Sequence, residues 1–136
     1  EVPVTVCGPA RRPVECSYWI SRNKSVAIME MSACAGITLV EGKEKDPERT
    51  TTYGVGEMLL DAVEHGCEHI IVGIGGSATN DGGIGMLAAL GFEFFDADGT
   101  WKRANFADNI KLNGETFYKT IKHFLAQLDI ITDSRF

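Results

Sequence analysis

The sequence lacks the features that would place the protein in a membrane or on nucleic acid. No apolar run approaches the roughly 20 residues of a membrane-spanning helix, and residues 1–4 show neither the basic nor the apolar part of a signal peptide. The net charge is −6 and the basic residues form no cluster, which argues against broad contact with nucleic-acid phosphates. We therefore expect a cytoplasmic protein whose partner is a small molecule.

Other common motifs are missing as well. The four cysteines form no Cys-x-x-Cys pair and have no histidine at metal-finger spacing, so reduced thiols are expected rather than a disulfide framework or a zinc site. No Gly-x-x-x-x-Gly-Lys-Ser/Thr sequence occurs, so any ATP site is not of the common phosphate-loop type. There is no internal repeat. Residues 41–49 are rich in charge of mixed sign and are expected to form a solvated connecting loop without a partner.

The length and composition favour one folded unit. A chain of 136 residues with 44% hydrophobic residues can form one compact domain with a core, so residues 1–136 are taken as a single domain. The chain opens directly in a strand pattern without an initiator methionine and closes on residues 133–136, which have no boundary signal. We expect it to be part of a larger protein.

Hydrophobic periodicity predicts the elements. Alternating residues favour a strand over residues 2–6 and a hairpin of residues 14–20 and 25–30. An amphipathic helix is expected to end near Gly66, and Thr50, Thr51 and Thr52 are expected to cap its start. Its apolar face consists of Val55, Met58, Leu59, Ala62 and Val63.

The second half predicts a βαβ-like alternation with parallel strands. It consists of a strand over 70–74, a helix over about 82–90 and a strand over 92–95. A last helix is expected over about 113–128, because Phe117, Ile121 and Phe124 share one face with later leucines. The predicted class is α/β, with a mixed or mainly parallel sheet and flanking helices.

Residues 70–85 form the most informative stretch, because an apolar strand enters a turn dense in glycine and small polar residues. The glycines allow backbone N–H groups to approach an anion closely. Ser77, Thr79 and Asn80 add neutral hydrogen-bonding groups, and Asp81 adds a carboxylate that could hold a metal ion or accept a proton. This mixture favours a small polyoxygenated substrate.

Two geometries compete for this turn. Gly73-x-Gly75-x-x-Ala78 is similar to a dinucleotide-binding fingerprint, with Asp96 placed to contact a ribose. That motif would put residues 79–83 inside a helix, where each glycine costs about 1 kcal/mol against alanine. An extended loop from Ser77 to Asp81, with Asp81 capping a helix that begins at Gly82 or Gly83, leaves the polar residues available for a ligand.

The same stretch closely resembles the central motif of the bacterial glycerate kinase family. Four other segments resemble that family in order along the chain, namely residues 8–14, 30–36, 50–57 and 95–99. Ala10 and Arg11 stand where the family has Leu-Gly, and the likeness weakens after Gly99. The family's members have two α/β domains, one inserted into the other, and the chain resembles most of the inserted domain.

The resemblance implies transfer of the γ-phosphoryl group of ATP to a hydroxyl group of D-glycerate, with Mg²⁺ on the nucleotide phosphates. Asp81 would coordinate the metal or take the hydroxyl proton, and backbone N–H groups with the start of the next helix would hold carboxylate or phosphate oxygens. The implied substrate-binding residues are Gly75, Gly76, Ser77, Thr79, Asn80, Gly82, Gly83, Thr51 and Thr52.

Several alternatives remain open at this point. Asp81 could be only a helix cap, and the loop could belong to a non-catalytic module that binds a carboxylate or phosphate, or to an NAD-linked oxidoreductase. No catalytic role is expected for the three histidines, and Cys34 and Cys67 are expected to be packed thiols. The sequence decides neither which hydroxyl is phosphorylated nor the oligomeric state.

Overall fold

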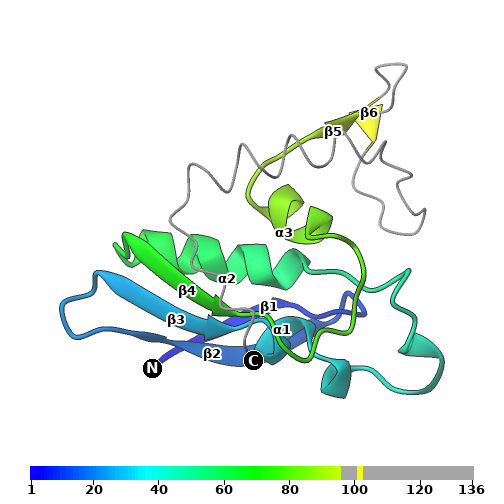
Figure 1. Ribbon diagram of the computed structural model, residues 1–136, viewed down its shortest axis with the longest axis horizontal. Helices are drawn as coiled ribbons and strands as arrows, with labels where there is room; N and C mark the ends of the chain where they lie inside the picture. The colour runs from blue at the N-terminus through cyan, green and yellow to red at the C-terminus, as the bar shows by residue number, and fades with distance from the viewer. Residues whose placement is uncertain (96–100, 103–136) are drawn as a thin grey trace.

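The computed structural model describes residues 1–95, 101 and 102 (Figure 1). A four-stranded mixed sheet has the order β1-β2-β3-β4. The strands are β1 (Val2–Cys7), β2 (Pro13–Ile20), β3 (Val26–Glu30) and β4 (His69–Gly73). The first three run antiparallel through short turns, and β3 pairs with β4 in parallel. The predicted strands over residues 2–6, 14–20, 25–30 and 70–74 are confirmed, and so is the α/β class.

Helix α2 (Tyr53–Glu64) makes the crossover between the two parallel strands and covers one face of the sheet (Figure 1). Its buried stripe contains Val55, Met58, Leu59 and Ala62 and packs in one core with residues of β1, β2 and β3. Four of the five residues of the predicted apolar face are therefore buried, whereas Val63 is exposed. Gly66 follows the helix with a φ of 87°, which is the left-handed ending that the sequence predicted.

The remaining described elements are short. They are α1 (Ser32–Ala35), the 3₁₀ turns η1 (Ile37–Leu39) and η2 (Gly42–Glu44), α3 (Ile84–Ala89), β5 (Phe94–Phe95) and β6 (Trp101–Lys102). Helix α3 packs against α2, so that α2 lies between the sheet and α3 (Figure 1). The helix predicted over 113–128 and the proposed ribose contact of Asp96 lie outside the described residues.

The predicted parallel βαβ unit of residues 70–95 is wrong. After α3 the chain does not return to the sheet as a parallel neighbour of β4; β5 instead pairs antiparallel with β6 in a separate two-stranded ladder. The six residues of α3 pack on α2 instead of crossing the sheet. The parallel connection runs through α2, which has twelve residues and is long enough for a crossover.

The charge-rich segment 41–49 also differs from expectation, because its side chains have partners. Glu44 accepts a hydrogen bond from the Arg12 guanidinium at 2.7 Å, and Asp46 lies 3.5 Å from Arg49. The Arg12–Glu44 contact links the segment to the β1–β2 turn, whereas the Asp46–Arg49 contact lies within the segment. Among the described residues, no helix is both long and apolar enough to span a membrane.

Candidate active site

Asp81 lies at the centre of the glycine-rich loop and is held by four hydrogen bonds. Its Oδ2 accepts from the Thr52 N–H at 2.7 Å, the Thr52 hydroxyl at 2.8 Å and the Gly85 N–H at 3.2 Å, while Oδ1 accepts from the Gly83 N–H at 3.0 Å. The carboxylate therefore joins the start of α2 to the start of α3. Oδ2 is saturated, but Oδ1 has one bond and retains acceptor capacity.

The threonine segment, residues 50–52, is buried and is hydrogen-bonded to the loop and to the start of α3. Thr50, Thr51 and Thr52 are all at most 5% exposed. Thr52 occupies the N-cap position of α2, yet its hydroxyl makes no cap bond to that helix. It donates to Asp81 and accepts from the Met86 N–H at 3.0 Å, while Thr51 Oγ1 accepts from the Tyr53 N–H. The predicted capping role is therefore wrong for Thr50 and Thr52, whose hydroxyls bond to other segments, and holds for Thr51.

A second set of bonds fixes the middle of the loop. The Thr50 hydroxyl donates to the Ala78 carbonyl at 2.8 Å, and the Thr79 hydroxyl donates to the Thr50 carbonyl at 2.8 Å. The Ser77 hydroxyl donates to the Thr79 carbonyl and accepts from its N–H. The hydroxyl groups of Ser77 and Thr79 are therefore used in bonds that shape the loop, which leaves them less available to a ligand.

The mouth of the loop is formed by exposed glycines after β4. Gly75 and Gly76 are exposed, and Gly76 has a φ of 70°, a left-handed conformation that glycine adopts without strain. The Gly76 carbonyl accepts from Ile37, but the hydrogen bonds within the described part of the chain give the N–H groups of Gly75 and Gly76 no acceptor. These two N–H groups are free for a carboxylate or phosphate oxygen.

The start of α3 does not provide the anion site that the sequence suggested. The Ile84 N–H donates to the Asp81 carbonyl, and the N–H groups of Gly85 and Met86 donate to Asp81 and Thr52. These donors, which would face an anion at a free helix end, are already used inside the protein. Asp81 accepts from the Gly85 N–H in the first turn of α3, but α3 begins at Ile84 and its N-cap residue is Gly83, so the predicted N-cap position of Asp81 is wrong.

The extended-loop geometry is confirmed over the dinucleotide geometry. No helix follows Gly75 directly, and residues 79–83 lie outside helices. Gly82 and Gly83 have φ values of 63° and 80°, so the Asn-Asp-Gly-Gly sequence forms a left-handed turn that other residues rarely adopt. Asn80 and Gly82 are exposed beside it, and the Asn80 N–H donates to the Pro47 carbonyl.

A metal ion at this site would have one protein carboxylate. Within the described residues there is no cluster of three or more Asp, Glu, His or Cys side chains that could hold an ion. Mg²⁺ is commonly bound by one or two carboxylates together with substrate phosphates and water, so Asp81 Oδ1 fits this pattern. The donor set is suited to an ion whose other ligands come from water or from a bound phosphate group.

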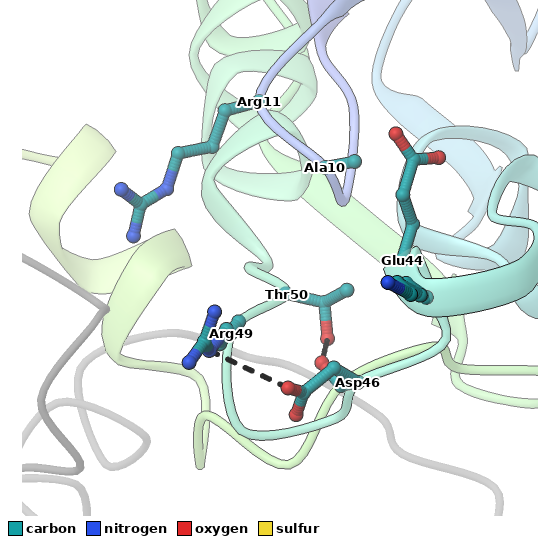
Figure 2. A pocket seen from close by; sticks show the side chains of 7 residues that line it. Ala10, Arg11, Glu44, Asp46, Arg49 and Thr50 are labelled. Carbon is teal, nitrogen blue, oxygen red and sulfur yellow. Dashed lines mark hydrogen bonds and ion pairs between the residues drawn. The ribbon is translucent and has the colours of Figure 1, made fainter.

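Next to the loop lies a hollow of about 510 Å³ that the sequence analysis missed (Figure 2). It is lined by Ala10, Arg11, Lys43, Glu44, Asp46, Arg49 and Thr50. The basic residues come from the β1–β2 turn and from segment 41–49, which are about thirty residues apart in the sequence. Nothing in either segment alone indicates that they share a cavity.

The cysteines take no part in the site. All four are free thiols, and Cys34 and Cys67 are buried. Burial raises the pKa of the Cys34 thiol to about 12 and also raises the pKa of Cys67. Both thiols are therefore protonated at neutral pH and unsuited to nucleophilic attack, as the sequence analysis expected.

Comparison with known proteins shows which protein family and which relatives the chain is similar to. A sequence profile described as the glycerate kinase family matches residues 1–132. The chain is 42% identical over 124 residues to a glycerate kinase of Bacillus cereus, covering 91% of this chain and 30% of the relative. It is 49% identical over 94 residues to glycerate 2-kinase of Escherichia coli, covering 69% and 25%.

A solved structure of a protein with the same assignment is also similar to the chain. A crystal structure from Salmonella typhimurium LT2, assigned as a glycerate kinase 2, superposes with a TM-score of 0.69 and 46% identity. The match covers 74% of this chain and 27% of that one. The chain thus spans about a quarter to three-tenths of the length of these relatives.

Proposed function

The chain belongs to the glycerate kinase family, and we propose that the protein transfers the γ-phosphoryl group of ATP to a hydroxyl group of D-glycerate. The proposal rests on the loop of residues 75–83, which hydrogen bonds hold in a fixed conformation. Asp81 and Thr52 fix its base, and two exposed glycine N–H groups lie free at its mouth. Phosphoryl transfer depends mainly on positioning and on stabilising negative charge, and a rigid loop of this kind supplies both.

In the proposed complex the N–H groups of Gly75 and Gly76 hold the carboxylate of D-glycerate. The exposed Asn80 side chain and Gly82 face the hydroxyl end of the substrate. Ser77, Thr79, Gly83, Thr51 and Thr52 have a supporting role, because their polar atoms are used in bonds within the protein. The site thus divides into a surface that contacts substrate and a buried layer that holds this surface in place.

Asp81 acts through Oδ1 in this proposal. Oδ1 faces the loop with one hydrogen bond and can accept the proton of the attacking hydroxyl or coordinate Mg²⁺. When bound, the ion neutralises charge on the nucleotide phosphates. Oδ2 meanwhile keeps Asp81 in position through its bonds to Thr52 and Gly85. We also propose a cytoplasmic location, because the proposed reaction uses ATP.

Substrate recognition is tested by titration calorimetry of the chain with D-glycerate and with D-lactate, which lacks only the 3-hydroxyl group. We expect D-glycerate to bind more tightly, and Asn80→Ala to remove the difference, because one hydrogen bond to a substrate hydroxyl is worth about tenfold in affinity. Equal binding of the two acids to both forms would contradict the proposal. A non-catalytic carboxylate-binding module would give such a result.

Phosphoryl transfer is tested in a larger protein. The 94 residues of the Escherichia coli glycerate 2-kinase that match this chain at 49% identity are replaced by those of this chain. We expect the folded chimera to release ADP only when D-glycerate is present, and Asp81→Asn to lower kcat about a hundredfold or more. A folded chimera that binds ATP but shows no glycerate-dependent ADP release would contradict the transfer role.

A further inference from the structure

The mouth of the glycine-rich loop has a second wall, formed by residues 30–37 at and after the end of β3. The Met31 N–H donates to the Gly73 carbonyl at 2.8 Å, and the Ile37 N–H donates to the Gly76 carbonyl at 2.9 Å. This segment, which contains α1, therefore lies beside the start of the loop, at the carboxyl ends of the parallel strands β3 and β4 (Figure 1). Ligands of open α/β sheets commonly bind outside the carboxyl ends of parallel strands.

The carboxylate of Glu30 occupies space that the missing side chain of Gly73 leaves open. The two residues are partners in the ladder between β3 and β4, and Glu30 is exposed. A Cβ added to Gly73 would lie 2.5 and 2.9 Å from the two carboxyl oxygens of Glu30. The φ of Gly73 is not left-handed, so the backbone does not itself require glycine here. Glycine at this position therefore allows the Glu30 carboxylate to lie against the backbone where the loop begins.

Two polar side chains on this wall are available to a ligand. Among the described residues, no hydrogen bond or ion pair involves the Glu30 carboxylate or the Ser32 hydroxyl. The Ser32 Cβ lies 3.3 Å, and its Oγ 3.9 Å, from the position that a Cβ on Gly76 would take. The mouth thus has the N–H donors of Gly75 and Gly76 on one side, and a carboxylate with a hydroxyl group on the other.

The two sides of the mouth are close enough for one small acid to reach both. Gly75 follows Gly73 by two residues, so their Cα atoms are at most about 7 Å apart. A 2-hydroxy acid carries its hydroxyl group on the carbon atom next to the carboxylate. When Gly75 and Gly76 hold that carboxylate, the neighbouring hydroxyl group can donate to Glu30, which as a carboxylate only accepts. A hydrogen bond to a charged acceptor is stronger than one between neutral groups.

We propose that Glu30 determines the specificity of the site by accepting a hydrogen bond from the 2-hydroxyl group of the substrate. The site thereby selects 2-hydroxy acids over acids that lack this donor. The inference rests on the proposed function, because it adds a contact to the D-glycerate site of residues 75–83. Asn80 is assigned to the hydroxyl group at the other end of the substrate, so each of the two hydroxyl groups of D-glycerate has its own partner.

The test compares D-glycerate with 3-hydroxypropanoate, which lacks only the 2-hydroxyl group. Both are singly charged anions at neutral pH, so a general change of charge alters both affinities alike and cancels in their ratio. The affinities are measured by following the amide signals of residues 75–83 during each titration. We expect the chain to prefer D-glycerate about tenfold, and Glu30→Ala to lower this preference to less than about threefold.

Glu15→Ala is the matched control. It removes an exposed carboxylate from the same face of the sheet, since Glu15 and Glu30 share the face of the cross-strand pair Trp19–Ile28. The control should change the preference by less than about twofold. Gly73→Ala keeps the Glu30 charge but places a Cβ where the carboxylate lies, so it should lower the preference as Glu30→Ala does. Both changes together should lower it no further than Glu30→Ala alone.

The outcomes separate the role of Glu30 from the proposed function. The same effect of Glu30→Ala and Glu15→Ala on the preference would overturn the role of Glu30. If D-glycerate is still preferred over D-lactate in that case, the proposed function stands without it. A preference for D-glycerate over 3-hydroxypropanoate that depends on Glu30, together with equal binding of D-glycerate and D-lactate, would count against the proposed function alone. Absence of binding of all three acids by the folded chain would overturn both.

Discussion

Asp81 makes four hydrogen bonds that hold the fold together, and the proposed function gives it a role in the reaction as well. Oδ2 receives three donors from two helix starts, and Oδ1 receives one. The sequence singled out Asp81 by its place in an Asn-Asp-Gly-Gly turn, and a role as a helix cap alone remained an open alternative. In the structure its carboxylate accepts from Gly85 in the first turn of α3, although Gly83 is the N-cap residue. Thr52 is a further partner twenty-nine residues away, which local sequence cannot reveal.

Asp81→Asn is predicted to destabilise the protein. The amide can accept at one atom only, so either Oδ2 or Oδ1 is replaced by a donor that faces an N–H group. Loss of the buried bonds is expected to lower the free energy of unfolding by about 1–3 kcal/mol, measured by urea denaturation. Unchanged stability would show that the four bonds are not formed in solution.

Thr52→Val tests the same bonds from the other side. Valine keeps the shape but removes the hydroxyl that donates to Asp81 and accepts from Met86, so a loss of about 1–2 kcal/mol is expected. Because the two residues are in contact, the double variant with Asp81→Asn should lose less than the sum of the single losses. Additive losses in the denaturation data would contradict the direct contact.

Cys34 makes stability depend on alkaline pH. Burial raises its pKa from 9.0 to about 12, so the folded chain keeps the thiol protonated while the unfolded chain ionises it above pH 9. The free energy of unfolding contributed by Cys34 is fully present below pH 9 and is lost as the pH rises toward 12. Cys34→Ala should flatten this part of the stability profile, and an unchanged slope would contradict the assignment.

At the scale of elements, the contact between α2 and α3 places the threonine segment against the loop. Gly56 of α2 allows the close approach: an added Cβ would meet the Met86 carbonyl and lie 2.6 Å from the Ala89 Cβ. A side chain at this position would push α3 away, and with it Gly85, which donates to Asp81, and Met86, which donates to Thr52.

Gly56→Ala is therefore predicted to destabilise the protein, although alanine is the better helix former. The overpacking cost of about 1–3 kcal/mol exceeds the gain of about 1 kcal/mol from helix propensity. Thermal unfolding measures the change. Val63→Ala, at a position of α2 that is 57% exposed, is the control and should leave the melting temperature nearly unchanged. A higher melting temperature for Gly56→Ala would contradict the close packing.

The elements were predictable where periodicity is strong. Strands β1 to β4 and helix α2 follow from residues 2–30 and 55–74, because alternation and helical spacing report burial directly. The βαβ prediction failed at β5, because a sequence pattern of strand, helix and strand does not show whether a helix of six residues is long enough to connect two parallel strands. Tertiary contact between α3 and α2 decided against it.

At the scale of the molecule, the chain brings three separate segments together at one end of the sheet. The turn at residues 8–12, segment 41–52 and the loop at 75–83 are linked by Thr51–Pro9, Asn80–Pro47 and Thr50–Ala78 bonds. The sequence predicted the loop because its chemistry is local. It could not predict the basic hollow, whose residues become neighbours only after the sheet and its crossover have formed.

Amide chemical-shift mapping tests whether the loop of residues 75–83 binds D-glycerate. The labelled chain is titrated with D-glycerate, with D-lactate as the control acid. We expect the largest D-glycerate shifts at the N–H groups of Gly75, Gly76 and Gly82, and small shifts at Gly85 and Met86, whose donors are already bonded. Shifts centred on Gly85 and Met86, or outside the loop altogether, would contradict it.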